Sequence, residues 1–259
     1  MQHRLDGRGA VVCGASEGIG RAVAEVLAEA GARLLLVARN AERLQQLCNA
    51  LVPHPEGHDI LPVDFDDTTA LQQALSGLRC RSYHILINNA GGPPAGPLVR
   101  ADIAELTRAF RRHVIASHLW MQTLLPTMQS ARWGRIINII STSVKQPIPG
   151  LGVSNTIRGA MASWAKTLAH ELGPHGITVN NILPGYTDTQ RLASLIQSKA
   201  QRESLNPETI IQHWQATIPA GRFAHPREIA YGVLFLASPQ ADYINGINLP
   251  IDGGRTQCL

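Results

Sequence analysis

One stretch decides the fold: Gly9-Ala10-Val11-Val12-Cys13-Gly14-Ala15-Ser16-Glu17-Gly18-Ile19-Gly20-Arg21. Its apolar start predicts a buried strand, and its glycines predict a turn. The residues after the glycines predict a helix. Gly14 allows the tight turn, Gly18 lets a pyrophosphate approach the backbone, and Gly20 lets the helix pack close to the sheet. Free N–H groups at the start of the helix favour phosphate. The stretch therefore predicts a dinucleotide site with contacts from Gly14, Ser16, Glu17, Gly18, Ile19 and Gly20.

Apolar strands alternate with helical segments along the rest of the chain. Further strands are predicted at Arg33–Ala38, Ile60–Val63, Tyr83–Ile87, Gly134–Ser141, Ile177–Ile182 and Ile247–Leu249. Helices are predicted at Ala41–Leu51, Thr68–Leu78, Ile103–Met128, Val153–Leu172 and Arg227–Leu236. The alternation predicts an α/β fold, a single-domain Rossmann-like doubly wound parallel sheet over residues 1–259 with helices on both faces. Ligands of such sheets bind at the carboxyl ends of the strands.

The segment from Gln190 to Arg222 departs from this alternation. It is amphipathic and irregular, with a break at Asn206-Pro207. We interpret it as a substrate lid, with a static surface insert as the alternative.

Charge and composition exclude several classes of protein. The net charge of +4 is mild, and no basic run alternates with aromatic residues, which argues against nucleic-acid binding. No apolar stretch reaches a membrane-spanning length, so we expect no membrane partner and a cytoplasmic location. The four cysteines, including Cys80, lack Cys-x-x-Cys spacing, which predicts reduced thiols and no metal site.

The residue after the second strand indicates which cofactor binds. A carboxylate there would bond the ribose 2′-hydroxyl of NAD, whereas an arginine pairs with the 2′-phosphate of NADP. The chain has Arg39 and no carboxylate at this point. A guanidinium binds a phosphate through two hydrogen bonds. The sequence therefore predicts NADP(H) as the preferred cofactor, with NAD(H) as the less favoured alternative. A solvated loop arginine is the alternative reading.

The chain resembles the short-chain dehydrogenase/reductase family over essentially its whole length. The resemblance rests on Gly-x-x-x-Gly-x-Gly at residues 14–20, Asn88-Asn89-Ala90-Gly91, Pro184-Gly185 and Asp252-Gly253-Gly254. It implies that Asp64 accepts from the adenine amino group, although a turn-forming aspartate is equally open. It also implies cofactor contacts from Asn89, Ala90, Gly91, Pro184, Gly185, Thr187 and Thr189. A small-molecule substrate and a homo-oligomer, tetramer or dimer, are implied as well.

The catalytic positions depart from the family pattern. Ser141 matches the family's serine, but Ser154 stands at the tyrosine position and Arg158 at the lysine position. His113 stands at the asparagine position. An aliphatic hydroxyl is far less acidic than a phenol, and one arginine does not bring it to neutrality. Arg158 still offers bonds to ribose hydroxyls and a fixed charge to stabilise an alkoxide.

The proton donor is therefore open at this stage. The candidates are His113, Tyr186, Lys145 and a water held by Ser141 and Ser154. The favoured function is an NADP(H)-dependent oxidoreductase acting on a carbonyl/alcohol substrate with an atypical catalytic site. The alternatives are a catalytically impaired NADP(H)-binding sensor or assembly protein, and a non-carbonyl reaction such as double-bond reduction or elimination.

Overall fold

A seven-stranded parallel sheet forms the centre of the molecule. The computed structural model describes residues 3–78 and 82–258. The strands lie in the order β3-β2-β1-β4-β5-β6-β7. Their bounds are β1 Gly9–Cys13, β2 Arg33–Ala38, β3 Asp59–Pro62, β4 Ile85–Asn88, β5 Gly134–Ile139, β6 Ile177–Pro184 and β7 Asn248–Ile251. β1, β4 and β5 are buried along their whole length, as expected of strands covered on both faces.

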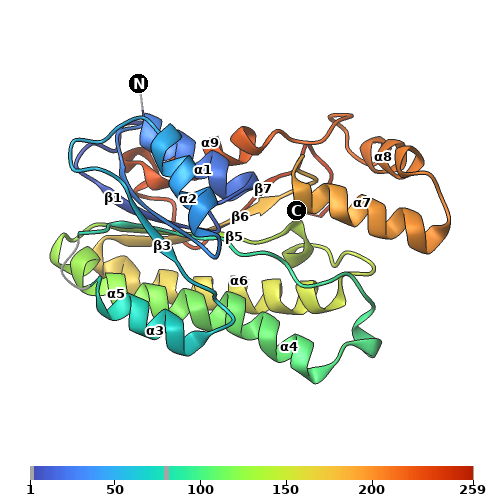
Figure 1. Cartoon of the computed structure of the whole chain (residues 1–259), viewed down its shortest axis with the longest axis horizontal. Helices are drawn as coiled ribbons and strands as arrows, with labels where there is room; N and C mark the ends of the chain where they lie inside the picture. Colours follow the sequence, from blue (N-terminus) through green and yellow to red (C-terminus); the bar gives the residue numbers. More distant parts are fainter. Residues whose placement is uncertain (1–2, 79–81, 259) are drawn as a thin grey trace.

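Helices cover both faces of this sheet (Figure 1). One face is covered by α1 (Gly18–Glu29), α2 (Ala41–Ala50) and α9 (Pro226–Ala237). The other is covered by α3 (Thr68–Ser76), α4 (Ile103–Phe110), α5 (Ala116–Ser130) and α6 (Gly152–Leu172). The predicted doubly wound parallel sheet is confirmed, and its strand and helix bounds lie close to those predicted.

Two predicted elements differ from the structure. The helix expected over Ile103–Met128 is interrupted by a π-helical turn at Arg111–Ile115 between α4 and α5. Such turns insert an extra residue into the helix and are frequent at functional sites. The strand expected to reach Ser141 ends at Ile139, because Ser141 accepts a hydrogen bond from the Ser143 N–H and caps a short 3₁₀ turn.

The segment after β6 folds into a pair of helices, α7 (Gln190–Glu203) and α8 (Pro207–Ala216), at one end of the molecule (Figure 1). The pair has its own apolar cluster, in which Leu192, Ile196 and Ile210 are buried. Asn206 caps α8, which explains the break predicted at Asn206-Pro207. The function of this pair as a lid stays a prediction.

Three cysteines are free thiols: Cys13, Cys48 and Cys258. Cys80 lies outside the described residues, so the prediction for it is untested. Within the described ranges, the helices are all too short or too polar to cross a bilayer.

Side-chain amides join the carboxyl halves of β4, β5 and β6 to the first residue of β7. The Asn88 amide donates to the Asn138 oxygen, and the Asn138 amide donates in turn to Asn181, both at 2.8 Å. Asn181 donates to Asn248, also at 2.8 Å. All three pairs are in register across the parallel strands. This amide ladder satisfies polar groups that would otherwise be costly inside the sheet.

Replacing the middle of the ladder is expected to destabilise the fold. Asn138→Ala leaves the Asn88 amide and the Asn181 oxygen buried without this partner, and should lower the free energy of unfolding by about 2–4 kcal/mol. Urea denaturation measures it. Asn49→Ala is the matched control, because Asn49 is exposed on α2 and should change stability by less than about 0.5 kcal/mol. An equal loss of unfolding free energy in Asn138→Ala and Asn49→Ala would contradict a stabilising ladder.

Candidate cofactor and active site

The turn between β1 and α1 has the geometry that phosphate binding requires. Gly14 and Gly18 have φ angles of +61° and +56°, which residues with a Cβ rarely adopt. A Cβ on Gly20 would overlap the Gly14 carbonyl oxygen, so this glycine allows the close approach that the sequence predicts. Among the described residues, no side chain caps the first turn of α1, and its first N–H groups stay available for phosphate.

Two arginines, Arg39 and Arg43, follow the end of β2 in the chain. Arg39 follows the strand with 73% of its side chain exposed, and its Nη1 lies 3.9 Å from a carboxylate oxygen of Asp64. Arg43 pairs with Glu17 of the glycine turn at 2.8 Å, a contact that the sequence analysis did not identify. Asp64 accepts from the Asp66 N–H at 3.0 Å, the turn-forming role that was one of its two readings. Its role toward adenine stays a prediction.

Three strand ends converge on the glycine turn. The Asn89 amide donates to the Gly14 carbonyl at 3.3 Å. Thr189, which caps α7 after β6, lies so close that a Cβ on Gly18 would be 3.3 Å from its methyl group. Thr187 donates to the Gly185 carbonyl at 3.2 Å. The predicted cofactor residues from β1, β4 and β6 therefore share one edge of the sheet.

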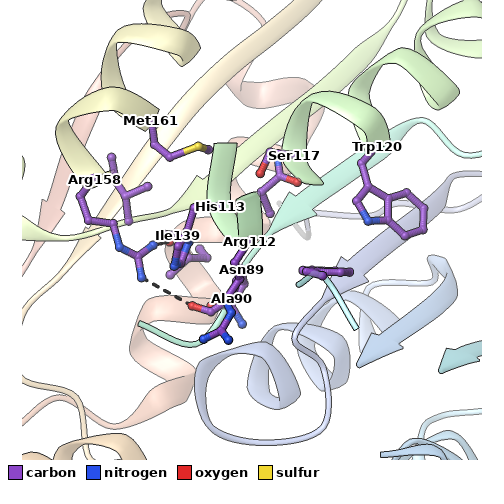
Figure 2. A pocket seen from close by; sticks show the side chains of 12 residues that line it. Asn89, Ala90, Arg112, His113, Ser117, Trp120, Ile139, Arg158 and Met161 are labelled. Atoms are coloured by element: carbon purple, nitrogen blue, oxygen red, sulfur yellow. Dashed lines mark hydrogen bonds between the residues drawn. The ribbon is translucent and has the colours of Figure 1, made fainter. Parts of the chain in front are cut away.

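The guanidinium of Arg158 occupies the centre of the predicted catalytic site (Figure 2). Only 8% of the residue is exposed. Its Nη1 donates to the Ile139 carbonyl at 2.9 Å, and its Nη2 lies 3.5 Å from the Ala90 carbonyl oxygen. It thus bridges the ends of β4 and β5. Burial and, second, the charge of Arg191 lower the pKa of Arg158 to about 10, so it stays a cation at neutral pH.

His113 lies on the π-helical turn beside Arg158 (Figure 2). The residue is 3% exposed, and its Nε2 has no hydrogen-bond partner among the described residues. Burial first, then the charges of Arg158 and Arg112, hold the pKa of His113 well below its ordinary value. At neutral pH the ring is therefore uncharged. An uncharged imidazole can accept a proton and pass it on, but it does not hold the extra proton of an imidazolium acid.

The other catalytic candidates occupy different surroundings. Ser141 is half-buried, and because its oxygen accepts from a backbone N–H, its own O–H remains free to donate. Ser154 is half-buried in the first turn of α6. Tyr186 stacks on Trp214 with ring centroids 4.6 Å apart, within the apolar cluster of α7 and α8. Burial raises the pKa of the Tyr186 phenol, and its role in proton transfer stays a prediction.

Two arginines near the site were missed by the sequence analysis. Arg191 lies in the first turn of α7 and donates to the Pro93 carbonyl at 2.7 Å. Arg112 lies next to His113 and forms a two-bond ion pair with Asp66. The sequence carried one signal for Arg191: a cation in the first turn of a helix opposes the helix dipole and suggests another task.

Comparisons with known proteins show which family the chain resembles in sequence and fold. A family model described as Enoyl-(Acyl carrier protein) reductase matches residues 14–256. The 3-oxoacyl-[acyl-carrier-protein] reductase FabG of Vibrio cholerae is 32% identical over 250 residues, covering 96% of this chain and 98% of the relative. The NADPH-dependent reductase BacG of Bacillus subtilis is 29% identical over 260 residues, covering 97% of this chain and 99% of the relative. L-sorbose reductase from Gluconobacter frateurii, solved with NADPH and L-sorbose, superposes with a TM-score of 0.90 at 29% identity over 100% of both chains.

The buried, uncharged His113 predicts a pH dependence of stability. Below about pH 6.5 the unfolded chain protonates this histidine while the folded chain does not, so the free energy of unfolding falls as pH falls. The free energy of unfolding of His113→Asn should fall less steeply than that of the parent, by up to about 1.4 kcal/mol per pH unit in this range. Urea titrations at several pH values measure the difference. Parallel pH profiles would contradict a histidine held uncharged in the fold.

Proposed function

Because the chain belongs to the short-chain dehydrogenase/reductase family, we propose that it is an NADP(H)-dependent oxidoreductase acting on a carbonyl/alcohol substrate through an atypical catalytic site. The observation that carries this proposal is the buried cation of Arg158 at the carboxyl edge of the sheet, beside Ala90 and Ile139. A fixed positive charge beside a nicotinamide site stabilises the oxyanion that forms when a carbonyl is reduced.

The described residues fit a phosphorylated nicotinamide nucleotide. Uncapped N–H groups at the start of α1 suit the pyrophosphate, and Arg39 suits the 2′-phosphate. Two relatives carry NADPH dependence in their names, BacG and YwfH, and the sorbose reductase structure contains NADPH. The cofactor is therefore NADP(H). When bound, NADPH supplies the hydride for the reduction.

Side chains of this chain supply the remaining parts of the reaction. The free O–H of Ser141 donates to the substrate oxygen, with Ser154 as a second hydroxyl from α6. Arg158 holds the ribose and offsets the negative charge that develops on that oxygen. Its pKa of about 10 keeps it charged, so it stabilises the oxyanion instead of donating the proton.

The proton travels by way of His113 in this proposal. His113, whose Nε2 has no partner among the described residues, lines a small cavity of about 10 Å³, roughly the space of one water, that Asn89, Ser117 and Arg158 also line (Figure 2). A water there would pass a proton toward the substrate while the uncharged ring accepts and returns it. This relay replaces the phenol of the usual family site.

The same environment favours a second candidate reaction. Among the described residues, His113 is uncharged and Tyr186 lies in the apolar cluster of α7 and α8, so neither is a ready proton donor beside Arg158 at neutral pH. Reduction of a conjugated double bond tolerates this arrangement, because the proton then reaches carbon and solvent water can deliver it. Binding of NADP(H) without turnover, as in a sensor or an assembly protein, is the remaining alternative.

We also propose that copies of this chain assemble into a homo-oligomer, a tetramer or a dimer. Large apolar side chains are exposed near α4, among them Val99, Ile103 and Phe110. Large apolar side chains exposed on one helix and the turn before it favour a protein interface there.

Removing the guanidinium at the end of β2 should weaken NADPH binding selectively. Arg39→Ala loses charge-assisted hydrogen bonds to the 2′-phosphate, so its Kd for NADPH should rise about tenfold or more. Its Kd for NADH should stay unchanged, because NADH lacks that phosphate. Fluorescence titration measures both. Arg4→Ala serves as control, since Arg4 is exposed and pairs with Asp6 before β1. Equal losses for the two nucleotides would contradict the assignment of Arg39.

Turnover tests the catalytic proposal. Purified protein with NADPH should reduce a member of a panel of ketones, sugars and acyl thioesters, and Ser141→Ala should lower kcat by about 10- to 1000-fold with NADPH affinity retained. The absorbance of NADPH reports the rate. Ser163→Ala is the control, because Ser163 is exposed on α6. Enoyl thioesters added to the panel distinguish the second reaction, and bound NADPH without turnover of any compound would favour the sensor.

A further inference from the structure

Two guanidinium groups meet at Gly92, just beyond the end of β4. A Cβ built on Gly92 would lie 3.5 Å from Nη2 of Arg191 and 3.9 Å from Nη2 of Arg158. Arg158 reaches this point from α6 and Arg191 from the first turn of α7. The missing side chain of Gly92 leaves the space between the two cations open.

Neither guanidinium has a carboxylate partner within the described ranges. Arg158 donates only to the carbonyls of Ile139 and Ala90, and Arg191 donates only to that of Pro93. A carbonyl offers a partial charge, so the desolvation of a buried cation is left incompletely offset. The charge of Arg191 also lowers the pKa of Arg158, which indicates that the two cations repel each other.

Three other shielded arginines are paired with carboxylates. Arg33 pairs with Asp59 at 2.8 Å, and Arg112 pairs with Asp66. Arg135, which is 1% exposed, pairs with Asp242. Arg158 and Arg191 differ from these three arginines, and they lie at the edge of the sheet where a substrate is expected.

From this pair we infer that the substrate carries a carboxylate, which Arg158 and Arg191 bind together across Gly92. The inference rests on the proposed function and names its substrate class: an oxo acid, or the corresponding hydroxy acid, whose carboxylate lies close to the reacting carbon. Arg158 binds the carboxylate from inside the site. Arg191, at the solvent-exposed rim, closes over it and draws α7 toward the Gly92–Pro97 loop.

The phosphates of the cofactor are the other anion source to consider. They are expected at the glycine turn, which faces Thr189 in the structure, whereas the guanidinium of Arg191 faces Gly92 and Pro93. Gly92 follows the carboxyl end of β4, on the side of the sheet where ligands of this fold bind. These positions favour a substrate carboxylate, and the experiment separates the two sources.

The test compares 2-oxohexanoate with its uncharged methyl ester on the full-length protein. Calorimetry on the complex saturated with NADP⁺ gives the Kd of each compound without requiring turnover, and steady-state assays with NADPH give KM. The acid should bind about 10- to 100-fold more tightly than the ester. Arg191→Gln should remove most of this preference and leave the Kd for NADPH unchanged. Arg202→Gln, an exposed arginine of the same helix, should change neither value.

Each other outcome has a definite meaning. Equal affinity for acid and ester overturns the inference, and so does a loss of NADPH affinity in Arg191→Gln, which assigns this arginine to the cofactor. Selective binding of the acid without turnover supports the anion site while contradicting the proposed oxidoreductase. Turnover of neutral carbonyls alone keeps the proposed function and rejects the carboxylate.

A second variant tests the site from within the chain. The contacts of a Cβ at Gly92 are ordinary van der Waals distances, so Gly92→Asp places a carboxylate between the cations without overlap. It should raise the thermal midpoint, because the charges become neutralised, and weaken binding of 2-oxohexanoate at least about tenfold. Gly92→Ala, which adds volume and no charge, is the control. Equal effects of the two variants would contradict electrostatic binding by the arginines.

Discussion

The buried positive charge of Arg158 is the constraint on which the rest of the site depends. A guanidinium taken out of water needs compensation, and here it comes from the carbonyl groups that end β4 and β5. These carbonyls are held in place by strands that are tied together, side chain to side chain, through Asn88 and Asn138. The amide ladder therefore supports the electrostatics of the site as well as the stability of the sheet.

The same charge determines which proton chemistry is available. A cation beside His113 adds to the effect of burial and keeps the imidazole uncharged, so the two side chains cannot both carry positive charge. A lysine and a tyrosine would couple differently, because the cation would then stabilise a phenolate. The change to arginine and serine thus removes an acid that is tuned by charge, and the relay that we propose in its place depends on geometry. The π-helical turn at Arg111–Ile115 is part of that geometry, since it contains His113.

Much of the fold follows from the sequence, because its signals are local. The glycine turn, the apolar strands and the break at Asn206-Pro207 are each determined by a few adjacent residues, and the structure has them where they were predicted. The π-helical turn was missed, since one extra residue in a helix leaves the apolar pattern almost unchanged. The partners of Asn88 in the amide ladder could not be predicted, because a hydrogen bond between strands depends on register, which a single strand does not contain.

In the candidate site, too, the sequence indicates which residues are involved but not the contacts between residues far apart in the chain. Ser141, Ser154, Arg158 and His113 were found by their positions in the chain, but the burial that lowers the pKa of His113 arises from residues far apart in sequence. Arg191 was missed because its importance arises only from its meeting with Arg158 across Gly92. One cation alone is an ordinary feature of a nucleotide-binding protein. Two cations that share a glycine and lack a carboxylate impose an electrostatic cost, and an anionic substrate that enters between them removes it at the moment of binding. As we propose, Arg191 draws α7 only over the ligand that neutralises the two cations, which links substrate selection to the assembly of the site.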